Sequence, residues 1–313
     1  MKMKIKHSTI ISKYDKLPIS ILTTVPDNID NDSIKGIFQL SHGMAEYKER
    51  YLPLMEYLTN NGYVCVINDH RGHGESIFSN EDLGYMFDGG YKAMVEDLKA
   101  VSDYIKSQFP NKKLNLYGHS MGSMVVRVYL KKYDKDLNSL IVCGSPSNNP
   151  LSIFGKYIAF MLCKIKGGHY RSKFLQKLTF GGFNKKIAGS KRSNSWLSRD
   201  EAIVIKYNED RKCGYKFTVN GFYNLLSLMQ DCYSPRNWKV SQPELPILFI
   251  AGENDPCITS KKDFLKAVNF IKNRSYKNVN WKLYPLMRHE IHNELGKEEV
   301  YQDILKGPLN TQI

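Results

Sequence analysis

The stretch LNLYGHSMGS at residues 114–123 decides the fold. Leu114–Tyr117 is an apolar run of strand length, and a helical pattern follows over Ser123–Lys132. Between them lies a GxSxG pattern, Gly118-His119-Ser120-Met121-Gly122, which in this context predicts a sharp turn with an exposed serine. We expect glycine at 118 and 122 because side chains there would collide with the neighbouring strand and helix. Ser120 is therefore a candidate nucleophile, and the alternative interpretation is a serine that caps a helix.

Similar apolar runs occur along most of the chain, and helical patterns separate them. Continuous runs of four to eight Val, Ile and Leu residues are typical of strands buried on both faces, as in a parallel sheet covered by helices. Repeated alternation of strand and helix therefore predicts an α/β fold with a mostly parallel sheet. The expected strands are Pro18–Thr24, Gly36–Leu40, Tyr63–Asn68, Leu114–Tyr117, Ser139–Cys143, Pro246–Ala251 and Val279–Tyr284, and the expected helices are Arg50–Asn60, Met94–Gln108, Ser123–Lys132, Lys261–Ile271 and Glu298–Leu305.

The alternation stops between about Ser147 and Pro235, where the sequence becomes basic and rich in aromatic residues. We interpret residues 147–235 as a helical cap inserted between two strands of one core domain. The core then comprises residues 1–146 and 236–313.

A serine hydroxyl needs a base and an orienting carboxylate, which in this type of fold follow the serine in the order acid, then histidine. Asp255 follows the strand run Pro246–Ala251, and His289 follows the next run, Val279–Tyr284. Both therefore fall at the carboxyl ends of strands, where ligand sites lie in open α/β sheets. Glu253 is the rival acid, and by themselves Asp255 could be a turn residue and His289 a surface residue.

Two backbone N–H groups are candidates to stabilise an oxyanion. Met121 begins the helix after Ser120, so its N–H has no partner within the helix. The second donor is expected after an earlier strand, where Gly43 permits close approach of the backbone and the Met44 N–H is our candidate. The alternative for this segment is a plain turn after a strand.

Metal and cofactor sites are not indicated. His289-Glu290-Ile291-His292 is one residue short of the HExxH zinc motif, so its histidines would not share one helix face. The cluster at 69–76 contains metal-ligating residue types but lacks ligand spacing, and we interpret it as a hydrogen-bonded loop. The six cysteines show no CxxC pair and are read as reduced thiols, and Cys257 has no support as a nucleophile. We expect no metal and no cofactor.

Together these segments resemble the monoacylglycerol lipase and lysophospholipase branch of the α/β-hydrolases. The residues that carry the resemblance are His42–Glu46 with Arg50 and Tyr51, Asp69–Ser76, Gly118–Ser123, Gly252–Pro256 and Arg288–Glu294. The resemblance implies an eight-stranded core and a cap inserted after the sixth strand. It also implies a catalytic triad of Ser120, Asp255 and His289, with Met44 and Met121 as backbone oxyanion donors.

The expected function is a serine carboxylester hydrolase that cleaves single-chain lipid esters or small carboxyl esters through an acyl-enzyme on Ser120. Two alternatives remain open. One is a peptidase of the proline iminopeptidase type, which would use the same three residues on an amide. The other is a lipid-binding protein that has kept the fold without catalysis.

The composition restricts the class of protein to which the chain can belong. With 42% hydrophobic and 24% charged residues the chain is globular, not disordered or collagen-like. The basic N-terminus does not lead into an apolar segment, and the longest apolar stretch, Tyr157–Cys163, is far shorter than the roughly 20 residues of a membrane span. We therefore expect a cytoplasmic protein.

The positive charge is concentrated in the expected cap. The chain carries a formal net charge of +14, and residues 151–212 hold 14 Lys and Arg against four Asp and Glu, which is +10. This predicts contact between the cap and an anionic membrane surface, whereas nucleic-acid binding is not expected because no reader motif accompanies the charge. The alternative is a packed cap helix with a solvated charged face.

Overall fold

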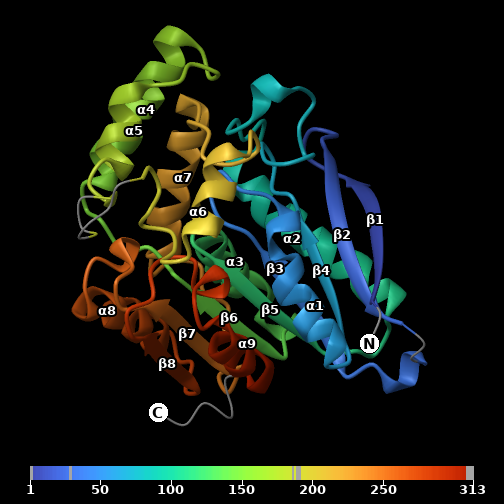
Figure 1. The fold of residues 1–313 in the computed structure, drawn as a ribbon. Coiled ribbons are helices and arrows are strands. Elements are labelled where there is room, and N and C mark those ends of the chain that lie inside the picture. Colours follow the sequence, from blue (N-terminus) through green and yellow to red (C-terminus); the bar gives the residue numbers. More distant parts are fainter. Residues whose placement is uncertain (1–2, 28–29, 185–186, 188–191, 308–313) are drawn as a thin grey trace.

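The core of the protein is an eight-stranded sheet, seen in a computed structural model that describes residues 3–27, 30–184, 187 and 192–307 (Figure 1). The strands lie in the order β1-β2-β4-β3-β5-β6-β7-β8. β2 is antiparallel to both of its neighbours, and the strands from β4 to β8 are parallel. Their bounds are β1 Met3–Ile11, β2 Pro18–Pro26, β3 Gly36–Ser41, β4 Tyr63–Asn68, β5 Leu114–His119, β6 Ser139–Cys143, β7 Ile247–Gly252 and β8 Val279–Tyr284. The mostly parallel α/β sheet expected from the sequence is thus confirmed.

The central strands are mostly apolar because helices cover both faces of the sheet. In β7, Phe249 belongs to one hydrophobic cluster, and its neighbours Leu248 and Ile250 belong to the cluster on the opposite face. α1 (Leu52–Asn60) and α9 (Lys297–Lys306) cover one face. α2 (Gly90–Gln108), α3 (Met121–Tyr133) and α8 (Lys261–Lys272) cover the other.

Most boundaries of the expected elements agree with the structure to within two residues, and one strand was not expected from its residues. α2 begins four residues before Met94, at Gly90, and the first turn of the expected helix at Arg50 is a 3-10 helix, Lys48–Tyr51. β1 is an edge strand whose side chains are half-buried or exposed. It therefore lacks the apolar run that reveals a strand buried on both faces.

Within the described ranges, four α-helices lie between β6 and β7, the segment expected to be an inserted cap. They are α4 Ser152–Lys166, α5 Lys173–Phe180, α6 Glu201–Glu209 and α7 Val219–Cys232. In Figure 1, α4 and α5 project above the sheet at the upper left. α7 contributes Phe222 and Leu228, among other residues, to the same hydrophobic cluster as α3, and α4 and α5 add one buried residue each, Ala159 and Leu175. Among the described residues, no helix combines the length and apolarity that crossing a membrane would need.

Candidate active site

Ser120 occupies a strained turn between β5 and α3. Its backbone has φ 54° and ψ −118°, a conformation that costs a non-glycine residue of order 1–3 kcal/mol. A Cβ at Gly118 would lie 2.5 Å from the Gly122 carbonyl oxygen, and a Cβ at Gly122 would lie 2.1 Å from the Ser41 carbonyl oxygen. Both positions therefore require glycine, and the turn leaves the Ser120 side chain at the carboxyl end of β5.

The side chains of Ser120, His289 and Asp255 form one hydrogen-bonded chain. His289 Nε2 lies 2.8 Å from Ser120 Oγ, and His289 Nδ1 lies 2.9 Å from Asp255 Oδ2. Asp255 stands in the loop after β7 and His289 in the loop after β8, so parallel strands bring them to the same edge of the sheet. The carboxylate and the imidazole are almost completely buried. The structure thus brings together the three residues that the sequence analysis singled out.

The rival residues lie elsewhere or have unsuitable chemistry. Glu253 is exposed, whereas Asp255 is buried against His289. Cys257 Sγ lies 3.9 Å from His289 Nε2, but burial raises the pKa of this thiol to about 11. Since the thiolate is the nucleophilic form of cysteine, Cys257 is a protonated bystander at neutral pH.

The electrostatics of the site favour a strong base. Burial alone would lower the pKa of the His289 imidazole, but the adjacent Asp255 carboxylate stabilises the imidazolium by more. The net result is a pKa well above the usual 6.5. His289 can therefore hold a proton taken from Ser120 during a reaction.

The loop of residues 42–47, which contains the Met44 N–H, passes beside Ser120, since a Cβ at Gly43 would lie 3.2 Å from the Ser120 Cβ. Neither this N–H nor that of Met121 donates a hydrogen bond within the part of the chain that the structure describes. His42 Nε2 accepts the His70 N–H at 2.9 Å, so the imidazole carries its proton on Nδ1 and donates it to the Gly43 carbonyl at 2.8 Å. That carbonyl and the Met44 N–H belong to one trans peptide and point in opposite directions. His42 therefore sets the orientation of the Met44 N–H.

Three residues important to this loop were quoted in the sequence analysis without a role. Glu46 accepts the Gly43 N–H at 2.6 Å, and Arg50 bridges Glu46 to Glu290 beside His289. Arg50 meets the Glu290 carboxylate with two nitrogens, at 2.6 and 2.8 Å. The four-residue spacing of Glu46 and Arg50 could have indicated their ion pair from the sequence. The pairing of Arg50 with Glu290 spans 240 residues, and no sequence pattern indicates it.

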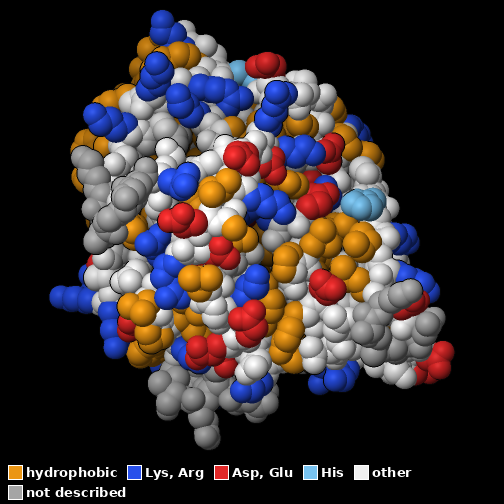
Figure 2. Space-filling model, in the orientation of Figure 1, with side chains coloured by type: hydrophobic (Ala, Val, Ile, Leu, Met, Phe, Trp, Pro, Cys, Tyr) orange, Lys and Arg blue, Asp and Glu red, His pale blue; other side chains and the backbone are white. Residues whose placement is uncertain are grey.

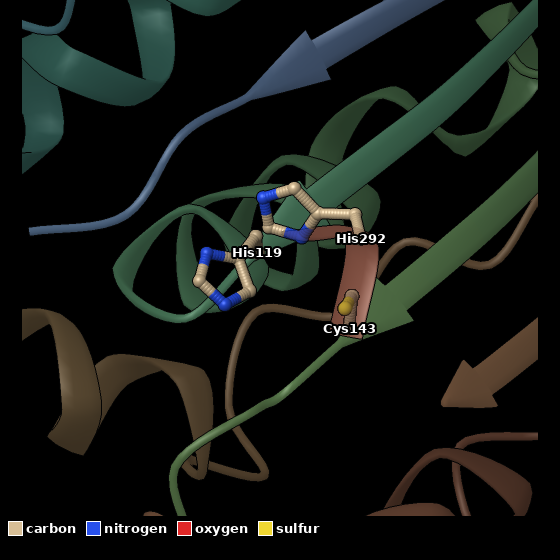
Figure 3. A group of neighbouring side chains, drawn as sticks. All are labelled: His119, Cys143 and His292. Atoms are coloured by element: carbon tan, nitrogen blue, oxygen red, sulfur yellow. The ribbon is translucent and has the colours of Figure 1, made fainter. Parts of the chain in front are cut away.

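His119 directly precedes the candidate nucleophile and belongs to a group of three possible metal ligands. Ligand atoms of His119, Cys143 and His292 lie within 4.8 Å of one another (Figure 3). His119 Nε2 faces the His289 carbonyl at 3.2 Å, and His119 Nδ1 lies 3.1 Å from the Tyr51 hydroxyl. Burial raises the pKa of the Cys143 thiol, which therefore stays protonated. Both ring nitrogens of His119 already have hydrogen-bond partners, whereas His292 Nε2 has none within the described part of the chain. Because His119 is engaged in this way, the group fits a hydrogen-bonded core better than a metal site.

A cavity of about 900 Å³ opens over Ser120 and extends under the insertion. Its floor includes Met44, Met121 and His289, and its outer walls come from α4, α5 and α7. Most of its lining area is apolar, with Met124, Leu225 and Met229 among the lining residues. Its size and lining suit a single flexible apolar chain.

Comparisons with known proteins agree with this arrangement. Residues 32–296 match the family described as serine aminopeptidase, S33. The chain is 23% identical to a monoacylglycerol lipase of Mycolicibacterium smegmatis over 270 residues, 86% of each chain. It is 24% identical to the phospholipase YtpA of Bacillus subtilis over 273 residues, 85% of this chain and 92% of that protein.

Among solved structures, a thermostable carboxyl esterase from Bacillus coagulans in complex with glycerol is 26% identical, with a TM-score of 0.86. The superposition covers 97% of this chain and 98% of the esterase. The S33 match extends over most of the chain and includes all the residues of the site described above. The protein therefore belongs to the serine aminopeptidase S33 family of the α/β-hydrolases, in the branch that resembles monoacylglycerol lipases.

Proposed function

We propose that this protein hydrolyses the carboxyl ester of single-chain lipids through an acyl-enzyme on Ser120. Its class, a carboxylic ester hydrolase, follows from the family and the named relatives. The observation that carries the mechanism is the chain of two hydrogen bonds, 2.8 and 2.9 Å long, that runs from Ser120 through His289 to Asp255.

The residues support a two-step reaction. Ser120 Oγ attacks the ester carbonyl carbon while its proton passes to His289 Nε2, and the oxyanion is stabilised by the N–H groups of Met44 and Met121. The carbon–oxygen bond to the alcohol then breaks, and His289 returns the proton to the leaving oxygen. A water molecule, deprotonated by His289, attacks the acyl-enzyme in the second step, and this releases the carboxylic acid and restores Ser120.

An ester is favoured over a peptide because the described lining of the cavity offers no free carboxylate for a substrate ammonium. Among the described residues that line it, Glu46 and Glu290 are the acidic ones, and both are paired with Arg50. The basic side chains Lys173, Lys177 and Lys216 also line the cavity. An aminopeptidase needs the opposite charge at this place.

The test of the mechanism is labelling of the full chain with a fluorophosphonate probe. We expect labelling of the wild type and none of Ser120→Ala, with loss of hydrolysis of p-nitrophenyl butyrate and of monoacylglycerol. A wild type that binds lipid but takes no label would instead be the non-catalytic homologue. Faster cleavage of prolyl amides than of esters would identify the peptidase.

We further propose that the front of the insertion docks on anionic membrane. This cap front, residues 151–180, contains six Lys and Arg and no Asp or Glu. It also exposes large apolar side chains, and Phe154 and Tyr157 are 70% and 65% exposed. Figure 2 shows basic side chains among hydrophobic ones at the upper left, where Figure 1 places α4 and α5. Three other lysines of the expected basic cap, Lys185, Lys186 and Lys191, lie outside the described residues.

The same surface borders the mouth of the cavity. Leu151, Phe154 and Leu178 are exposed, and each also lines the cavity above Ser120. A lipid lying in a bilayer against the cap front would therefore meet the entrance directly. Each accessible Lys or Arg close to an anionic bilayer contributes about 1 kcal/mol of attraction.

A further inference from the structure

The second half of the insertion, residues 196–214, holds the 42–47 loop by hydrogen bonds. The Tyr207 hydroxyl, from α6, donates to the Ala45 carbonyl at 3.1 Å. The Gly214 N–H donates to the same carbonyl at 2.9 Å. From the loop side, the Tyr47 hydroxyl donates to Asp210 Oδ2 at 2.6 Å.

Ala45 is the residue of this loop that most needs such support. Its φ of 53° lies in the left-handed region, where a non-glycine residue is held only by its surroundings. A carbonyl oxygen has two lone pairs, and at Ala45 both are occupied by donors from the insertion. Ala45 directly follows Met44, so the geometry at Ala45 determines where the Met44 backbone lies.

The other contacts of the loop come from the core. The Glu46 carboxylate accepts a hydrogen bond from the Gly43 N–H, and His42 Nδ1 donates one to the Gly43 carbonyl. These contacts set the orientation of the peptide before Met44, whereas Tyr207 and Gly214 hold the residue after it. The Met44 N–H is thus held from both sides, by the core and by the insertion.

We propose that Tyr207 is a positioning residue that, together with the Gly214 N–H, places the Met44 N–H for oxyanion stabilisation. This inference rests on the proposed function, in which Met44 is an oxyanion donor. Tyr207 itself touches neither the nucleophile nor the base. It acts through the Ala45 carbonyl.

The surroundings keep Tyr207 a hydrogen-bond donor. Burial raises the pKa of Tyr207 by more than the Arg50 guanidinium, 4.8 Å from the ring, lowers it. The phenol is therefore protonated at neutral pH. The same half of the insertion also pairs with the His289 loop, since the His289 and Glu290 N–H groups donate to the Trp196 and Leu197 carbonyls at 3.3 and 2.7 Å.

The variant Tyr207→Phe tests this inference because it removes one hydroxyl and leaves the ring in place. With p-nitrophenyl butyrate we expect kcat to fall about 10-fold with KM changed less than twofold, a fraction of the roughly 10²–10³-fold lost when a whole oxyanion donor is removed. Affinity for a trifluoromethyl ketone, which forms a hemiketal oxyanion on Ser120, should fall by the same factor as kcat. Asp210→Ala, which loosens the turn leading to Gly214, should show the same pattern to a smaller extent.

The matched control is Tyr129→Phe. Tyr129 is as buried as Tyr207, and its hydroxyl donates to Ser102 at 3.2 Å, away from the cavity. Tyr129→Phe should lose similar thermal stability and keep kcat and ketone affinity.

Two results would overturn the inference: wild-type kcat and ketone affinity in Tyr207→Phe, or equal losses in both tyrosine variants. If instead Ser120→Ala still hydrolysed the ester, the proposed function would fail, independently of Tyr207.

Discussion

At the scale of single residues, the raised pKa of His289 predicts how the activity depends on pH. A general base must be neutral, and the Asp255 carboxylate holds the imidazole in its charged form to a higher pH than the usual 6.5. We expect kcat/KM for p-nitrophenyl butyrate to increase with pH through a midpoint above 6.5. In Asp255→Asn the midpoint should fall, and kcat should drop about 10⁴-fold as in comparable triads.

Glu253→Gln is the control for this prediction, because Glu253 is the exposed rival acid two residues away. It should retain the wild-type midpoint and kcat. If Glu253→Gln lost activity while Asp255→Asn kept it, the assignment of the acid would be wrong.

The residues of the candidate triad could be predicted because each lies in the turn or loop that follows a strand recognisable in the sequence. Ser120, Asp255 and His289 need only the strand runs to be placed at one edge of the sheet. Tyr207 could not be found in this way, since its partner Ala45 is 162 residues distant and the contact uses a backbone carbonyl. Every residue has a backbone carbonyl, so a contact to one does not restrict the residue type and cannot be recognised in the sequence.

At the scale of elements, Arg50 connects two loops of the candidate active site that come from opposite ends of the chain. Its guanidinium is 11% exposed, and the carboxylates of Glu46 and Glu290 are each 2% exposed. We expect Arg50→Met to lower the free energy of unfolding by about 3–5 kcal/mol, because two buried carboxylates lose their counter-ion. Urea denaturation at pH 7 measures this loss.

The pH dependence of that contribution has a definite sign. Burial alone would raise the pKa of Glu46, but Arg50 and then His119 lower it by more, to well below the usual 4.5. A carboxyl with a lowered folded-state pKa stabilises the protein above its unfolded pKa, and this stabilisation is lost as the pH falls through the folded value. The difference in stability between wild type and Arg50→Met should therefore shrink below about pH 4.5.

Lys277→Met provides the comparison, since it breaks an ion pair with Glu244 in which both side chains are more than half exposed. Such pairs contribute little to stability. If both variants unfolded at the same urea concentration as the wild type, the Arg50 bridge would have no structural role.

Strand and helix types followed from hydrophobic pattern wherever both faces of an element are buried. The pattern failed at β1, which is an exposed edge strand, and at the start of α2, where Gly89 and Gly90 adopt positive φ. The pattern also could not separate the helices of the insertion that project from the core from α7, because α7 is as apolar as a core helix and packs as one. Each failure occurred where tertiary contacts, not local periodicity, decide the structure.

At the scale of the whole molecule, the net charge of +14 is unevenly distributed. The cap front holds six of the basic residues without an acidic one, beside exposed apolar side chains. This combination is typical of surfaces that lie on anionic bilayers, where apolar burial and charge attraction add. The proposed docking surface therefore predicts a separation between two kinds of substrate.

The triple variant Ile153→Ser, Tyr157→Ser and Ile165→Ser tests that separation. These residues are 63%, 65% and 67% exposed on α4 and do not line the cavity, so the fold and the hydrolysis of soluble p-nitrophenyl butyrate should be unchanged. Co-sedimentation with phosphatidylglycerol vesicles and hydrolysis of a monoacylglycerol held in them should both fall at least about 10-fold, since three apolar side chains no longer enter the bilayer. Ile5→Ser with Ile11→Ser, at exposed positions on β1, is the control and should behave like the wild type. Binding of the wild type that depended neither on anionic lipid nor on salt, or a triple variant that bound as the wild type does, would show that the cap front is only a solvated face.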